Sequence, residues 1–173
     1  YGKPATDLIV TGDVDPKDTG TTVKFLPDGQ IFPVTEFSFD VLSSRLRELA
    51  FLNKGVKIII EDERTEKKNE FHYDGGIISF VEYLNSNKNP LHKVVYFSKG
   101  KNGIQFEYAL QYNDGYQESV FSFANTINTH EGGTHLIGFK TALTRVMNNY
   151  TEKNTEKNKL KGMKLTSDDV REG

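Results

Sequence analysis

The residues best suited to metal chemistry are two histidines close to position 130. His130 and His135 enclose Glu131, Gly132 and Gly133. A zinc-protease helix presents histidines four positions apart, so that both rings lie on one face. The spacing here is five, which is about 500° of helical rotation, so the two rings diverge. We therefore expect a glycine turn with positive φ, followed by a helix N-terminus, and no metal site.

Other signatures of catalysis are missing from the sequence. It has neither a Gly-x-x-x-x-Gly-Lys-Ser/Thr nor a Gly-x-Gly-x-x-Gly phosphate cradle. The acid pairs Glu61-Asp62 and Asp168-Asp169 fall at an expected strand end and helix start, where solvated surface is the usual interpretation. With no cysteine, disulfides and thiolate metal sites are excluded. We expect no catalytic residue in this chain.

Positive charge is concentrated near the C-terminus. Between Thr134 and Lys164 seven cations stand against two anions, an excess of five. The cations are Lys140, Arg145, Lys153, Lys157, Lys159, Lys161 and Lys164. A basic face can bind phosphate by releasing counterions, so a nucleic-acid contact and a merely solvated face both remain open.

Helices and strands must position these side chains. Apolar spacing predicts helices over 40–53, 77–84 and 134–150, and β-branched or alternating runs predict strands over 56–62, 70–73, 93–98, 104–111 and 116–123. Separate runs of helices and hairpins predict an α+β domain with helices on one face of a sheet. The expected buried residues are Leu46, Leu49, Phe80, Val81, Phe139, Leu143 and Val146.

The bulk composition fits a globular domain, with 36% hydrophobic and 27% charged residues and a net charge of −2. No apolar run approaches the roughly 20 residues that span a bilayer, so we expect no membrane partner. The chain starts at Tyr1 rather than Met, and Thr166 and Asp169 suit the start of a helix. These ends are those expected of an excised fragment, with a polar, flexible tail over 151–164.

Short segments of the sequence, taken in their order along the chain, resemble those of a known protein family. They include 19–25, Pro27-Asp28, Ile31-Phe32, 45–53, 71–76, Tyr83-Leu84-Asn85, 111–114, 131–135, Gly138-Phe139, 143–145 and 169–173. In this order they resemble the ATPase subunits of bacterial type II DNA topoisomerases, the gyrase B and topoisomerase IV B family. The intact run 45–53 is more similar to gyrase.

The resemblance implies two domain parts. Residues 1–28 would be the end of a GHKL-type ATP-binding domain, and residues 29–173 a transducer domain that stops before the Gln-Thr-Lys loop. The implied transducer fold is α+β, with a four-stranded-type sheet, helices on one face and a left-handed βαβ crossover, which few proteins have.

The resemblance also implies site residues and partners. Thr21 and Val23 match the Gly-Thr-x-Val pattern that floors the adenine site, with ATP and Mg²⁺ bound only in the full-length enzyme. Lys140, where the family commonly has arginine, and Arg145 would line the DNA cavity. The implied partners are double-stranded DNA, the gyrase A protein and a second copy of gyrase B, in the cytoplasm at the nucleoid. The ATPase protein of topoisomerase IV and an independent nucleic-acid-binding module are the alternatives.

Overall fold

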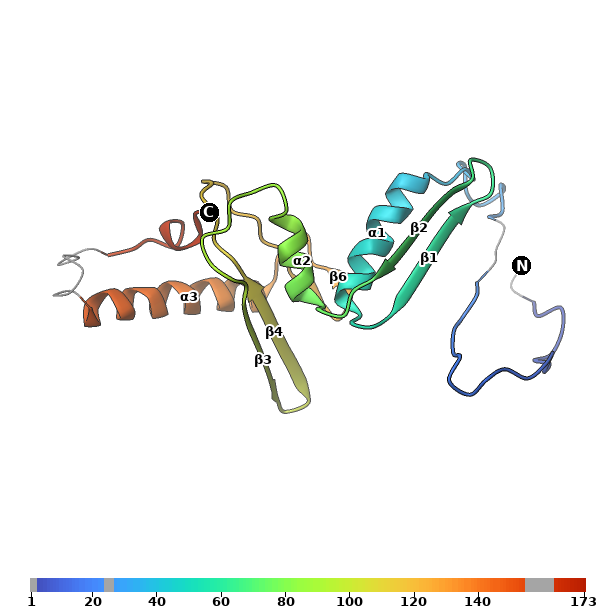
Figure 1. The fold of residues 1–173 in the computed structure, drawn as a ribbon, viewed down its shortest axis with the longest axis horizontal. Helices are drawn as coiled ribbons and strands as arrows, with labels where there is room; N and C mark the ends of the chain where they lie inside the picture. The colour runs from blue at the N-terminus through green and yellow to red at the C-terminus, as the bar shows by residue number, and fades with distance from the viewer. Residues whose placement is uncertain (1–2, 24–26, 155–163) are drawn as a thin grey trace. The chain divides into compact units, whose positions relative to one another are not determined.

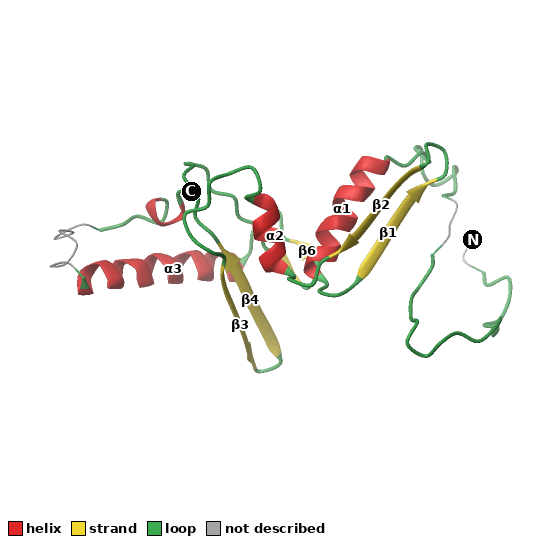
Figure 2. Cartoon of the chain, viewed as in Figure 1, coloured by secondary structure: helices red, strands yellow, loops and turns green. Residues whose placement is uncertain are grey.

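A computed structural model describes residues 3–23, 27–154 and 164–173. It divides into two units, Tyr1–Phe37 and Ser38–Gly173. In the first unit the described residues form only turns and loops, drawn in green in Figure 2. Lys24 and Phe25, which the resemblance includes, and most of the expected polar tail lie outside the described residues.

The second unit begins with a helix packed on a hairpin. Ser38 caps helix α1 (Phe39–Leu52), since its hydroxyl accepts the Val41 N–H. Strands β1 (Lys57–Asp62) and β2 (Lys67–His72) pair antiparallel, and α1 lies against both of them (Figure 1). A partly buried bond joins the two parts, because Asn69 Nδ2 donates to Ser43 Oγ at 2.6 Å.

An aromatic cluster forms the core between α1 and helix α2 (Ile77–Leu84). The ring of Phe51, only 1% exposed, stacks on Tyr73 with centroids 3.7 Å apart. The rings of Phe80 and Tyr83 on α2 lie 5.3 and 5.5 Å from it. Such pairs stabilise beyond the area they bury.

A second hairpin and a long helix complete the unit. Strands β3 (Val95–Lys101) and β4 (Ile104–Leu110) pair antiparallel, and β5 (Phe123–Ala124) pairs with β6 (Ile127–Asn128). Helix α3 (Thr134–Lys153) is followed by the 3₁₀ turn η1 (Asp169–Arg171), which packs against it. Phe139 on α3 meets Tyr108 on β4, with ring centroids 5.3 Å apart.

The predicted α+β class and the predicted hairpins are confirmed, but the described strands do not join into the larger sheet that the resemblance implies. The described residues form three two-stranded antiparallel sheets, with neither a four-stranded sheet nor the parallel pair that a left-handed βαβ crossover needs. Each sheet is a hairpin of strands adjacent in sequence. Of the expected strand over 116–123, Phe123 pairs with Asn128 and the Ser122 carbonyl accepts the Thr129 N–H at 2.8 Å. Residues 117–122 line a cavity opposite β4 and do not pair with that strand.

The predicted helices are confirmed, with α3 three residues longer than expected. Of the predicted core residues, Phe80 is buried and Val146 is 57% exposed. Leu46, Leu49, Val81, Phe139 and Leu143 are half-buried. The prediction for Val146 is wrong, because the covered side of α3 at this turn carries Asn148, which bonds to Leu165, and further along it Thr151, which is 6% exposed, whereas Val146 lies on another side.

Candidate functional site

Helix α3 positions the two cations predicted to contact DNA. Its entry is the predicted glycine turn, with φ of 80° at Gly132 and 156° at Gly133. The helix starts at Thr134, and Ile137 N–H donates to the Gly133 carbonyl at 3.0 Å. Glycine is suited to this entry because L-residues with a side chain rarely adopt such φ values.

Lys140 is held by a carboxylate from another segment. Its Nζ lies 2.6 Å from Oε1 of Glu118, a residue of the extended segment before β5. Both side chains are partly covered, at 28% and 30% exposure. The ammonium of Lys140, which the resemblance places at the DNA cavity, is therefore paired within its own domain.

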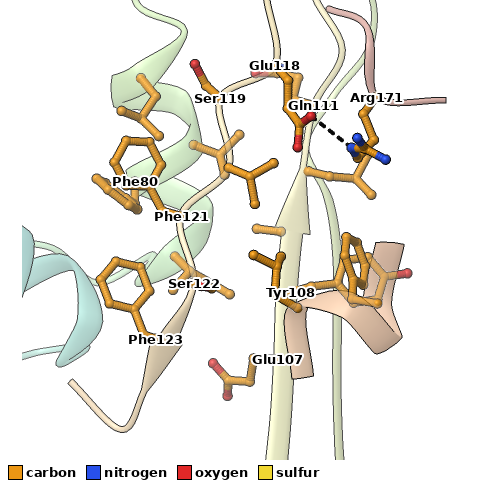
Figure 3. A pocket seen from close by; sticks show the side chains of 18 of the residues that line it. Phe80, Glu107, Tyr108, Gln111, Glu118, Ser119, Phe121, Ser122, Phe123 and Arg171 are labelled. Carbon is orange, nitrogen blue, oxygen red and sulfur yellow. Dashed lines mark ion pairs between the residues drawn. The ribbon is translucent and has the colours of Figure 1, made fainter. Parts of the chain in front are cut away.

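The same carboxylate contacts a second cation. Oε2 of Glu118 lies 2.9 Å from Nε of Arg171, whose side chain is only 12% exposed (Figure 3). Burial alone would raise the pKa of Glu118, but the contacts with Lys140 and Arg171 outweigh it and hold that pKa below its usual range. Glu118 is therefore the shared anion of a three-residue cluster, which we call the Glu118 cluster.

Arg171 is anchored independently within its own turn. Its guanidinium donates to Asp168 at 2.8 Å and to the Ser167 carbonyl at 2.6 Å. Contact with Glu118, ahead of the opposing effect of burial, raises the pKa of Arg171 above its ordinary value. Arg171 thus has partners within its own turn in addition to Glu118.

The turn that carries Arg171 is fixed by the capping pair expected from the sequence. Thr166 N–H donates to Asp169 Oδ2 at 2.7 Å, and Asp169 N–H donates to Thr166 Oγ1 at 3.2 Å. The hydrogen bonds from Thr166 also lower the pKa of Asp169. This reciprocal pattern is that of a capping box, although it starts a short 3₁₀ turn rather than an α-helix.

An apolar cavity of about 750 Å³ lies beside the Glu118 cluster. One wall is β4 and the other is the segment 117–125. Glu107 of β4 lies on the same side of the strand as Phe121 and Phe123, whereas the ring of Tyr108 lies on the opposite side (Figure 3). Glu118 and Arg171 are among its few charged lining residues. The apolar walls lower the local dielectric and strengthen the ion pairs at this place.

Arg145, the second predicted DNA contact, is exposed and makes no ion pair with another described residue. Five helical positions separate it from Lys140, so the two side chains leave α3 about 140° apart. The structure therefore does not bring them to one point. Lys153 continues the helix, whereas Lys157, Lys159 and Lys161 lie outside the described residues.

The predicted adenine contacts lie in the first unit. Thr21 and Val23 are in backbone without assigned secondary structure, and Val23 is 75% exposed. The residues that line the cavity described above all belong to the second unit. Both Thr21 and Val23 are exposed in the described structure.

The two histidines are not arranged as metal ligands. His135 Nε2 lies 3.4 Å from the Thr129 hydroxyl, which ties the ring to the loop before α3. In the described part of the chain, no group of three or more His, Asp or Glu residues could hold a metal ion.

Glu118 and Arg171 were missed by the sequence interpretation. Glu118 is one acid in a polar run, and Arg171 follows two acids that were interpreted as solvated surface. Their association with Lys140 joins residues distant in sequence, so no spacing rule could have indicated it.

Comparison with known proteins assigns the family. The DNA gyrase B family model matches residues 76–173. A gyrase B protein of Bacillus mycoides is 55% identical over 99% of this chain and 43% of its own length. Another from Halalkalibacterium halodurans is also 55% identical, over 99% of this chain and 27% of its own length. This chain belongs to the DNA gyrase B family.

Solved structures agree with this family. The 43K ATPase domain of Thermus thermophilus gyrase B in complex with an aminocoumarin has a TM-score of 0.71 and 34% identity, covering 85% of this chain and 40% of that one. The gyrase B protein of Myxococcus xanthus has a TM-score of 0.70 and 27% identity, covering 80% and 42%. The chain thus spans less than half the length of these relatives. Within its described residues, no helix has the length and apolar character to cross a membrane.

Proposed function

We propose that this chain is the transducer part, with the end of the ATP-binding domain, of the ATPase subunit of DNA gyrase. The observation that carries the proposal is 55% identity to a gyrase B protein across 99% of the chain. Residues 1–28 are assigned to the ATP-binding domain and residues 29–173 to the transducer. In the complete enzyme the transducer couples ATP binding and hydrolysis to the capture and transport of a DNA duplex.

Nucleotide chemistry depends on residues outside this chain. Thr21 and Val23 contribute to the floor of the adenine site, with Mg²⁺ as the companion of ATP. Their exposure in the present chain supports a role that needs the rest of the ATP-binding domain. The chain alone is expected to hydrolyse no ATP, since none of its residues is assigned a catalytic role.

DNA is contacted by cations of α3. Arg145 is exposed and has no ion-pair partner among the described residues, so its guanidinium is available to phosphate. Lys140 supplies a second charge, held as an ammonium beside Glu118. Phosphate contacts carry no sequence information, so the duplex is bound without sequence preference.

The complete enzyme works in the cytoplasm at the nucleoid, with gyrase A and a second copy of gyrase B as partners. A topoisomerase IV is the second candidate, because the corresponding topoisomerase 4 protein of Enterococcus faecalis is 51% identical over 99% of this chain. The two enzymes differ in the product of strand passage. Gyrase introduces negative supercoils, whereas topoisomerase IV separates linked circles.

The test uses the complete gyrase B protein reconstituted with gyrase A. ATP-dependent negative supercoiling of relaxed plasmid is the expected result, and decatenation without supercoiling would assign topoisomerase IV. Arg145→Gln is expected to lower the stimulation of ATP hydrolysis by DNA, with the exposed Asn149→Gln on the same helix as its control. A stimulation that is equal in both variants at low and high salt would exclude Arg145 from the DNA contact.

A further inference from the structure

The Glu118 cluster joins three segments through one carboxylate. Oε1 of Glu118 contacts Lys140 on α3, and Oε2 contacts Arg171 next to the chain's last residues. Each oxygen thus serves a different cation. Loss of one contact leaves the other in place.

The two cations differ in what they have besides Glu118. Arg171 also contacts Asp168 and Ser167. Among the described residues, Glu118 is the one anion within ion-pair distance of Lys140. Lys140 is therefore the cation that can separate from Glu118, while Arg171 remains in contact with it.

The cluster also makes the departure of Lys140 electrostatically feasible. A partly buried carboxylate left without a partner is strongly unfavourable. If a phosphate takes the ammonium of Lys140, Arg171 still neutralises Glu118 with a side chain only 12% exposed. Neither the carboxylate nor the ammonium is then left uncompensated.

We propose that Glu118 is a built-in competitor of DNA at Lys140: a backbone phosphate engages Lys140 by displacing its ammonium from Glu118, while Arg171 retains the carboxylate. This inference rests on the proposed DNA contact of α3 and adds a residue that limits it. Glu118 weakens duplex binding in the resting domain and pairs with Lys140 again when the duplex leaves.

Binding of a labelled duplex of mixed sequence to the full chain tests the proposal. Glu118→Gln removes the competing charge and nearly preserves the shape of the side chain. It is expected to tighten binding about threefold to fivefold, the range of a partly exposed ion pair. Glu118→Asp keeps the charge but shortens the reach toward Lys140, and its affinity should lie between those of Glu118→Gln and the parent.

A matched control separates competition from general charge. Glu131 is an exposed acid just before α3 and makes no ion pair with another described residue. Glu131→Gln changes the net charge equally, and it should tighten binding less than Glu118→Gln does. Far-ultraviolet circular dichroism of each variant checks that the domain is folded.

The double variant Glu118→Gln with Lys140→Gln tests whether Glu118 affects DNA binding through Lys140. Lys140→Gln should weaken binding, and adding Glu118→Gln should change the affinity by less than about twofold, because the two residues are coupled. Tighter binding by Glu118→Gln in both backgrounds, or tightening no greater than in Glu131→Gln, would overturn the competition. Weaker binding by Lys140→Gln would then still support the proposed DNA contact. An affinity unchanged by Lys140→Gln at about 50 and about 200 mM salt would refute that contact, and the competition with it.

Discussion

The side-chain amide of Asn148 pairs with the backbone of Leu165 in both directions. Nδ2 of Asn148 donates to the Leu165 carbonyl at 3.0 Å, and its Oδ1 accepts the Leu165 N–H at 2.8 Å. The amide thus makes with Leu165 the two hydrogen bonds that a residue of a neighbouring β-strand would make. This pair holds the approach to η1 against α3, and therefore supports the position of Arg171.

Asn148→Asp is expected to destabilise the domain. The carboxylate has no donor for the Leu165 carbonyl, so one half-buried acceptor loses its partner, at about 1–3 kcal/mol. Urea unfolding followed by circular dichroism measures the change. The neighbouring Asn149→Asp is exposed and should remain within about 0.5 kcal/mol of the parent, so equal losses in both would show that the pair contributes nothing specific.

Phe51→Ala is expected to remove the centre of the aromatic cluster. The ring is 1% exposed and touches Tyr73, Phe80 and Tyr83, so its loss leaves a cavity and should cost about 3–5 kcal/mol. The midpoint of urea unfolding should fall accordingly. Val146→Ala, at a residue 57% exposed, should change stability by less than about 0.5 kcal/mol. A large loss in Val146→Ala would restore the sequence prediction that Val146 is buried.

Gly132 and Gly138 provide a matched test of backbone strain. Gly132 has φ of 80°, so Gly132→Ala is expected to destabilise by about 1–2 kcal/mol. Gly138 lies inside α3, and an added Cβ meets no atom within 4 Å. Gly138→Ala should therefore stabilise by about 0.5–1 kcal/mol through helix propensity. Thermal unfolding measures the midpoint temperature of both variants. A midpoint for Gly132→Ala at or above that of Gly138→Ala would contradict this explanation.

The hairpin end of β1 should show an acid with a low pKa. The side-chain hydrogen bond from Arg64 is the main cause that holds the pKa of Asp62 at about 2, below its ordinary 3.8. The pKa is lower in the folded state, so the ionised pair favours folding above pH 3.8, and this contribution disappears as pH falls toward about 2.

Carbon-detected NMR titration of Asp62 measures this pKa directly. Arg64→Gln should move it most of the way back to 3.8, while Arg64→Lys, which keeps the charge but loses the planar fork, should give an intermediate value. An unchanged pKa in Arg64→Gln would show that another group sets it.

Local patterns predicted the helices and hairpins because their signals lie within one segment. The apolar stripe from Leu42 to Phe51 and the glycines before Thr134 mark α1 and the start of α3. Periodicity identifies an apolar stripe along a helix, but not which side of that helix another segment covers, and Asn148 and Thr151 rather than Val146 lie on the covered side of α3. This is why Val146 was assigned to the core although it is exposed.

The arrangement of sheets and the Glu118 cluster depend on contacts between distant segments. Residues 117–122 and β4 line opposite walls of one cavity and do not pair, and the sequence of neither segment indicates this. Similarly, Lys140 was recognised as a cation, but its partner Glu118 lies in another element. The nucleotide contacts Thr21 and Val23 and the DNA contacts Lys140 and Arg145 stay predictions.

The β3–β4 hairpin has a consequence for how the chain behaves at high concentration. In the described residues its strands pair only with each other, so each strand has an open edge, beside the exposed rings of Tyr96, Phe97 and Phe106. An open edge is a template for backbone pairing with another copy, and lysines oppose that pairing by charge repulsion. Lys99 and Lys101 stand at the end of this hairpin, both exposed. Acetylation of these two lysines would remove the repulsion and lower the concentration at which the chains self-associate through their edges.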